Sequence, residues 1–168
     1  MSNENHEIAV DSIYTALLQL MEQKPYEEIT ITDIVRRAGV SRMAYYRNYD
    51  SKDEILTRRL RGLLDPLIAL LRDEETLTQT EFWITFFETF RGNSIVQNIM
   101  KAGLHASLYQ INMEFMEKEY VRRFPLSENE EERMMLIYRM VGCTAGLIMY
   151  IQVNPAVSSE VLAAQILS

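Results

Sequence analysis

The sequence predicts an all-α fold, and three observations lead to this prediction. Apolar residues recur at helical spacing along most of the 168-residue chain, as at Ile13, Ala16, Leu17 and Leu20. Glycine, proline and good capping residues separate these segments. No segment shows the strict apolar–polar alternation that predicts a strand. The apolar share of 48% and the charged share of 24% are those of an ordinary globular protein and exclude wholesale disorder.

The first predicted helix covers about residues 7–24. It ends at Lys24-Pro25, because proline disfavours the helical conformation in the residue before it. Thr30 and Asp33 then have the spacing of a capping box, in which each side chain accepts a hydrogen bond from the other residue's backbone N–H. A short second helix follows and ends at Gly39, which readily adopts the left-handed conformation.

Two further helix starts follow closely along the chain. Ser41 is a good N-cap for a third short helix, Arg42–Tyr49. Ser51 is a good cap for the next helix, which begins near Lys52. Asp65-Pro66 has the pattern of a cap and a first-turn proline, so the helix kinks or restarts there.

Beyond residue 75 the pattern stays helical, with glycine and proline between the segments. The candidate helices cover about residues 78–91, 94–102, 104–123, 128–153 and 158–167.

Charge is distributed unevenly along the chain. The formal net charge of −7 argues against a nucleic-acid partner, because phosphate binding needs cations. Residues 34–61, however, contain eight Lys and Arg against three Asp and Glu, a local charge of +5, so the remainder sums to −12. This basic stretch in an acidic chain marks the segment to interpret.

The basic stretch contains two short helices separated by Gly39-Val40-Ser41, which is the length of a helix-turn-helix. In that motif the second helix lies in the major groove of DNA and the first crosses the backbone. Tyr45 and Tyr49 are four residues apart and can face the core, which leaves the other side chains of the second helix outward. A helical hairpin with a solvated basic face fits the same pattern, so both interpretations stay open at this point.

The outward side chains have chemistry that suits DNA. Arg42 can donate to O6 and N7 of guanine, and Ala44 allows close approach to base edges and contact with a thymine methyl. The free N–H groups at the start of the first short helix, beside Thr30, suit a phosphate. Three more side chains suit phosphate oxygens: Tyr46, Arg47 and Lys52. Arg36 and Arg37 are either backbone contacts or solvated.

Residues Ile13 to Leu56 resemble the DNA-binding domain of TetR/AcrR-family transcriptional regulators. The resemblance is gapless over 44 residues, a quarter of the chain. It runs through Ile13, Ala16, Met21, Tyr26, Thr30, Asp33, Ile34, Ala38-Gly39-Val40-Ser41, Tyr46, Tyr49, Ser51-Lys52 and Glu54-Ile55-Leu56. It implies a three-helix DNA-binding domain over residues 1–56, with the helix-turn-helix at about 30–49. A helical dimerisation and effector-binding domain then covers residues 57–168.

The resemblance implies roles for single residues. Thr30 is similar to a helix cap that touches phosphate, and Thr32 matches a position that can reach a base edge. Tyr46 matches a phosphate-binding tyrosine, and Lys52 matches the lysine at the start of the following helix. The groove-facing start of the recognition helix is matched by Ser41, Arg42, Met43 and Ala44.

Three positions depart from the family pattern. Met43 stands where the family most often has Gly or Pro, Asn48 where His is common, and Pro25 where Gly is frequent. The first departure can alter base preference, so the operator sequence does not carry over.

The C-terminal part is rich in large apolar groups, and one aromatic face has helical spacing: Phe82, Trp83, Phe86, Phe87 and Phe90. By the resemblance, helices at about 128–153 and 158–167 form a four-helix bundle with their copies in a second subunit. Gly142, Ala145 and Gly146 would allow close helix approach across a two-fold interface. Packing within one subunit is the alternative. A small apolar effector is expected here, and its binding residues are unknown.

No enzyme constellation is recognisable, so we predict no catalytic residue, metal or cofactor. His6 and His105 are the only histidines, and the single cysteine, Cys143, allows neither an intrachain disulfide nor metal-ligand spacing. Its apolar surroundings predict a packed thiol. The N-terminus lacks a signal-peptide pattern, and the apolar run Val141–Val153 is too short to cross a bilayer. We expect a soluble, cytoplasmic protein.

The sequence therefore predicts a homodimeric repressor that binds double-stranded DNA and leaves a pseudo-palindromic operator when a small apolar effector binds. The alternative is an activator or coregulator of the same fold, controlled by a protein partner without a small-molecule effector.

Overall fold

The computed structural model describes residues 2–168, with side chains from His6 onward, and this described part contains helices and no strand. The predicted all-α fold is confirmed. Two compact units divide the chain. Unit 1 contains the residues up to Arg59 together with Asn98–Leu104, and unit 2 contains Leu60–Gln97 and His105–Ser168.

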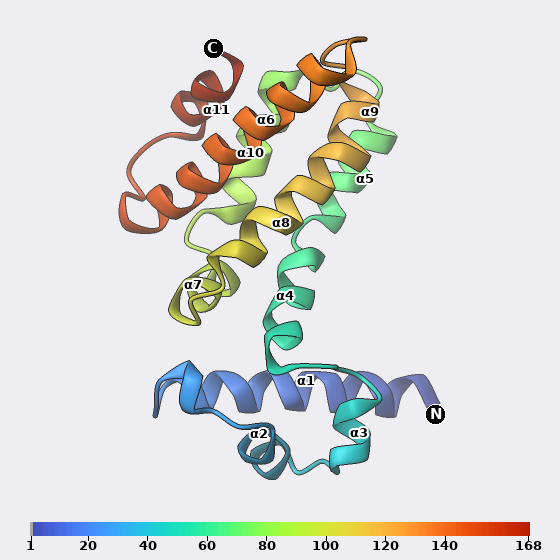
Figure 1. Ribbon diagram of the computed structural model, residues 1–168, viewed down its shortest axis with the longest axis vertical. Helices are drawn as coiled ribbons and strands as arrows, with labels where there is room; N and C mark the ends of the chain where they lie inside the picture. Colours follow the sequence, from blue (N-terminus) through green and yellow to red (C-terminus); the bar gives the residue numbers. More distant parts are fainter. Residues whose placement is uncertain (1) are drawn as a thin grey trace. The chain divides into compact units, whose positions relative to one another are not determined.

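Unit 1 is built on a long first helix. Its elements are α1 (Ser2–Met21), η1 (Tyr26–Glu28), α2 (Ile31–Ala38), α3 (Arg42–Tyr46) and the larger part of α4 (Lys52–Gly62). Both α2 and α3 pack against α1, and Figure 1 shows them on the same side of it. The apolar face of α1 is buried as predicted, with Ile13 and Leu17 fully inaccessible.

Helix ends in unit 1 depart from the predictions by a few residues. Helix α1 ends at Met21 and continues as turns, in which the N–H groups of Gln23 and Lys24 both donate to Leu20 O. Pro25, with φ −53°, then precedes the 3-10 turn η1, which the sequence did not predict. Helix α3 ends at Tyr46 rather than Tyr49, because the chain tightens after it into an i→i+3 bond.

Unit 2 holds the remaining helices, of which α7 is shared with unit 1. They are α5 (Asp65–Asp73), α6 (Gln79–Phe90), α7 (Ser94–Lys101), α8 (His105–Phe115), η2 (Met116–Tyr120), α9 (Val121–Arg123), α10 (Glu130–Val153) and α11 (Ser159–Leu167). The restart near Asp65 is confirmed, although Asp65 is the first helical residue and not the cap. The helix predicted over 104–123 is present from His105 to Arg123, with the π-helical turn η2 between α8 and α9.

The aromatic face of α6 forms the core of unit 2. Its five predicted members are all buried: Phe82, Trp83, Phe86, Phe87 and Phe90. Trp83 Nε1 donates to the hydroxyl of Tyr120 at 3.0 Å, which satisfies the indole in the core. Burial raises the pKa of Tyr120 to about 12. Helix α6 packs against α11, and α8 packs against α10.

One face of α10 is apolar and exposed in the single chain. Met135 is 67% exposed and Tyr138 56%, and Gly142 and Gly146 are exposed along the same helix. Cys143 is also exposed, so the prediction of a packed thiol is wrong for the single chain. Helix α10 begins at Glu130, before the apolar run considered in the sequence. Its 24 residues and mean hydropathy of 1.6 make it long and apolar enough to cross a membrane, but core helices of soluble proteins have the same length and composition.

Candidate nucleic-acid interface

The N-terminus of α2 is formed by the predicted capping box. Thr30 Oγ1 accepts from the Asp33 N–H at 3.2 Å, and Asp33 Oδ2 accepts from the Thr30 N–H at 3.1 Å. Lys24 Nζ donates to the same carboxylate at 2.8 Å. This hydrogen bond and those from Thr30 hold the pKa of Asp33 well below its usual range. Thr30 is exposed, and the next N–H groups of the helix have no intrahelical acceptor, so they can donate to an anion.

The turn between α2 and α3 has the geometry that its sequence predicts. Gly39 adopts φ 67°, a left-handed conformation that favours glycine, and the Val40 N–H donates to Val35 O at 3.1 Å. Ser41 Oγ accepts from the Ala44 N–H at 3.0 Å and begins α3. These two caps fix the angle at which α3 leaves the turn.

Two tyrosines attach α3 to the domain. Tyr45 is fully buried and Tyr49 is 2% exposed, as predicted, and their ring centroids lie 5.9 Å apart. Burial raises the pKa of both hydroxyls, so both rings stay neutral over the physiological range. Their burial orients the opposite side of α3 away from the core.

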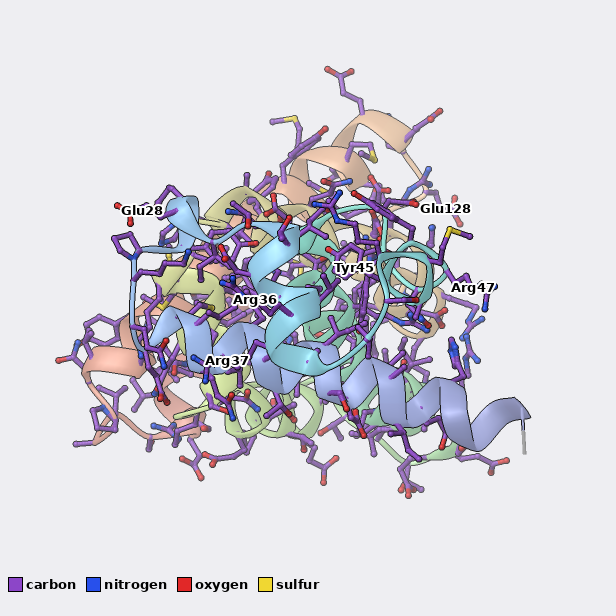
Figure 2. The ribbon with its side chains drawn as sticks, turned by 90° about the horizontal axis from the view of Figure 1, so that it is seen from below. Glu28, Arg36, Arg37, Tyr45, Arg47 and Glu128 are labelled. Atoms are coloured by element: carbon purple, nitrogen blue, oxygen red, sulfur yellow. The ribbon has the colours of Figure 1, made fainter. Side chains whose placement is uncertain are left out.

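That opposite side carries the predicted contact residues. Met43 is 66% exposed and Tyr46 54%, although both are large and partly apolar. Ser41, Arg42 and Arg47 are exposed too, and Ala44 is partly exposed. Figure 2 looks onto this side of unit 1, with Arg36 and Arg37 on α2 and Arg47 at the outer edge beyond α3.

Two of the residues predicted to reach base edges contact each other. Arg42 Nη2 donates to Thr32 Oγ1, which joins the first turn of α2 to the first turn of α3. Both side chains are exposed. The threonine hydroxyl therefore restricts the orientation of a guanidinium whose other N–H groups remain available.

Lys52 is already satisfied inside unit 1. Its Nζ donates to Tyr26 O at 2.6 Å, to Ile29 O at 3.0 Å and more weakly to Glu27 O at 3.4 Å. It also lies 4.3 Å from the centroid of the Tyr26 ring. These carbonyls belong to η1 and to the residue after it, so Lys52 braces the segment that leads into Thr30. The sequence reasoning missed this role, because the partners lie more than twenty residues away in the chain.

The local charge of +5 is only partly neutralised in the structure. Three arginines of the stretch pair with carboxylates: Arg36 with Asp33, Arg59 with Asp11 and Arg61 with Glu114. Arg37 donates instead to the neutral side chains of Gln19 and Gln23. Among the described side chains, no carboxylate pairs with Arg37, Arg42, Arg47 or Arg58. The face formed by α2 and α3 therefore keeps uncompensated positive charge, as an electrostatic footprint for phosphate requires.

Comparison with known proteins assigns this unit. Residues 13–58, from α1 into α4, match the family described as bacterial regulatory proteins, tetR family. This segment carries a tetR-family helix-turn-helix. The matched tetR segment contains every residue predicted to contact DNA, and it makes the protein a DNA-binding transcriptional regulator with a helix-turn-helix. Members of the tetR family are regulators and not enzymes. No curated protein matches the chain.

Proposed function

We propose that the protein is a cytoplasmic, homodimeric repressor that binds a pseudo-palindromic operator. The proposed DNA contacts are Thr30, Thr32, Ser41, Arg42, Met43, Ala44, Tyr46 and Arg47. Lys52 completes the set predicted from the sequence, with a second proposed role as the brace of the segment before Thr30. The observation that carries the proposal is the outward face of α3, which combines exposed contact residues with unpaired arginines.

Specific and general contacts can be separated by two matched arginine variants. Arg42→Ala is expected to cost about 1–3 kcal/mol on the preferred site and to relax the preference at one base, if the guanidinium binds guanine through two hydrogen bonds. Arg47→Ala is expected to weaken binding to all sequences alike and to reduce the salt slope by about 0.9 per contact. Equal losses on preferred and random DNA for both variants would reject base reading by Arg42.

The proposed dimer interface is the outward face of α10 and α11. Supporting it are the exposed apolar side chains of both helices, which include Met135, Val161 and Leu167. Gly142 and Gly146 lie four residues apart, and a Cβ built on either meets no atom within 4 Å. The single chain therefore does not need these glycines for its own packing, whereas close approach of a second helix would use them.

A glycine substitution tests the interface without disturbing the subunit. Gly142→Gln adds a side chain where the single chain has space and improves helix propensity by up to about 1 kcal/mol. It is expected to leave helix content unchanged and to shift the protein to monomer in analytical ultracentrifugation. Gly62→Gln, on α4, is the control, because its site is equally open. A dimer that tolerates Gly142→Gln as well as the control would contradict this interface.

The repressor is proposed to respond to a small apolar effector bound in unit 2. The effector would act only through a difference in its affinity for the DNA-bound and released states. Support for a ligand site comes from the apolar interior of unit 2, which holds a buried cavity beside Phe90 and Leu108.

A second candidate is control by a protein partner. It is favoured by the small volume of that cavity, about 10 Å³, and by a hollow of about 550 Å³ at the start of α10, beside Met135 and Arg139. The two candidates differ in a measurement of operator affinity. Release of the purified protein from its operator by a small apolar molecule alone favours the effector, and the absence of any such release favours the protein partner.

A further inference from the structure

A basic hollow lies between α2 and the turn that ends α1, close to the proposed DNA contacts. Its volume is about 540 Å³, and all of its lining residues belong to unit 1. They are Leu20, Gln23, Lys24, Asp33, Arg36 and Arg37. Three of these side chains are cationic and one is anionic, so the lining has a net charge of +2.

The one carboxylate of the hollow is already paired. Asp33 Oδ2 accepts from Lys24 Nζ at 2.8 Å and from Thr30, and its Oδ1 accepts from Arg36 Nη2 at 3.1 Å. The Arg36 side chain is 79% exposed, and an exposed ion pair of this kind adds little stability. Lys24 alone can therefore balance Asp33 when Arg36 turns toward another anion.

Arg37 is held in place without being neutralised. Its Nη1 donates to Gln19 Oε1 at 3.3 Å, and its Nη2 donates to Gln23 Oε1 at 2.8 Å. Both acceptors are neutral amides, so they orient the guanidinium and leave its charge uncompensated. Three of its five N–H groups have no acceptor in the described part of the chain. An oriented, planar guanidinium with free donors suits the oxygens of a phosphate.

The hollow adjoins the side of α2 that takes part in the proposed DNA contacts. Arg36 follows Thr32 by four residues, so the two side chains lie one turn apart on the same helix face. Thr32 accepts a hydrogen bond from Arg42 at the start of α3. Figure 2 shows Arg36 and Arg37 on the side of unit 1 that also carries Arg47. The hollow therefore extends the proposed contact face along α2.

We propose that Arg37, with Arg36 beside it, binds one backbone phosphate of the DNA next to the base pairs that α3 contacts. A phosphodiester offers acceptor oxygens and a full negative charge, which match the free donors and the positive charge of the hollow. A phosphate contact holds the register of α3 and adds affinity, but it carries no direct base information. This inference rests on the proposed operator binding and adds a contact outside the set assigned there.

The salt dependence of binding to random-sequence duplex DNA tests the contact without a known operator. In Arg37→Gln the slope of log affinity against log salt is expected to fall by about 0.9 per contact. The ratio of wild-type to variant affinity should then shrink about 3.5-fold per contact from about 50 to 200 mM salt. Arg122→Gln is the matched control, because Arg122 is an exposed arginine of unit 2 whose partner Glu119 keeps Arg72. A slope for Arg37→Gln equal to that of the wild-type protein or the control would overturn the proposal.

A scan of single phosphates locates the contact on the DNA. Methylphosphonates, in which a methyl group replaces a charged phosphate oxygen, are placed one at a time along a duplex enriched by the wild-type protein. One position adjoining each half-site is expected to weaken wild-type binding about three- to tenfold and to leave the binding of Arg37→Gln unchanged. A scan in which no position behaves in this way would contradict the assignment.

A second variant keeps the test valid if Arg37→Gln does not fold. Gln23→Glu has the same shape as the wild-type side chain and gives Arg37 a carboxylate partner. The salt slope should again fall by about 0.9 per contact, and an unchanged slope would reject the phosphate contact.

The sequences enriched from random DNA separate this contact from the proposed function. Arg37→Gln should enrich the same sequences as the wild-type protein, and enrichment of different sequences would overturn a phosphate-only role. If the wild-type protein selects an operator but Arg37→Gln keeps the full salt slope, operator binding stands and this contact fails. If the slope falls but no sequence is enriched, the contact stands and base reading by α3 fails.

Discussion

Replacing Lys52 with Met is expected to loosen unit 1 more than it weakens the charge-dependent contact with DNA. Methionine keeps an unbranched stem of similar length and removes the ammonium. The ammonium spans the carbonyls of Tyr26 and Ile29 and lies over the Tyr26 ring. Its removal leaves the Ile29 carbonyl, just before the cap at Thr30, without a donor among the described residues, and leaves the Tyr26 carbonyl only the Ile29 N–H.

The size of the effect follows from these contacts. The hydrogen bonds of 2.6 Å and 3.0 Å contribute about 1 kcal/mol each, below the usual range for charged donors because Lys52 is partly exposed. The ammonium over the ring of Tyr26 adds roughly 0.5–1 kcal/mol. The free energy of local opening should therefore fall by about 2.5–3 kcal/mol, a factor of about 60–150 in the opening equilibrium.

Hydrogen exchange of the α2 amides measures this opening directly, without requiring the whole chain to unfold in one step. Lys101→Met is the control, because Lys101 is an exposed lysine in the part of α7 that belongs to unit 1. The salt slope of DNA binding by Lys52→Met should fall by less than the roughly 0.9 expected for a lost phosphate contact. Unchanged hydrogen-exchange protection of the α2 amides, together with a salt slope reduced by the full value of roughly 0.9, would refute the bracing role.

Three further predictions concern the same unit. Gly39→Ala should lower the free energy of unfolding by about 1 kcal/mol, because alanine is strained at a positive φ although its Cβ would meet no atom within 4 Å. Gly62→Ala in α4 should not destabilise the protein, and urea unfolding of the two variants measures the difference. The pKa of Asp33 is lower in the folded domain than its ordinary value of 3.8, so the charged carboxylate stabilises the domain at pH values above 3.8. This contribution is lost as the pH falls through the folded-state pKa, and the acid unfolding of Asp33→Asn should lack it. Thr32→Val should leave stability within about 0.5 kcal/mol but weaken discrimination at the base read by Arg42, and a double-mutant cycle should show a smaller effect once Arg42 is Ala, because the part that acts through Arg42 is then gone.

The locally determined features were those that the sequence could predict. The cap at Thr30, the left-handed Gly39 and the cap at Ser41 each depend on residues within a few positions, and each was predicted and observed. The burial of Tyr45 and Tyr49 followed from helical spacing in the same way. A match of these short-range signals to one motif was enough to identify the fold of unit 1.

Contacts between distant segments could not be read from the sequence. The carbonyl partners of Lys52 and the hydrogen bond between Arg42 and Thr32 depend on how separate helices meet. The inclusion of Asn98–Leu104 in unit 1 is of the same kind. So is the pairing of Asn112 with Thr144, 32 residues apart, which leaves Asn112 Oδ1 buried without a partner. Polar side chains such as these have several acceptable partners, and only the tertiary fold selects one.

Selection from random-sequence DNA with the full-length protein tests most directly whether the α3 face reads an operator. Two copies of α3 in successive major grooves should enrich a pseudo-palindrome with half-site centres ~34–36 Å apart, or further if the operator spans more than one turn. Arg42→Ala should lose the preference at one base of each half-site, and binding should weaken steeply with salt. Binding without enrichment of any sequence, or enrichment that Arg42→Ala leaves unchanged, would contradict base reading through the start of α3.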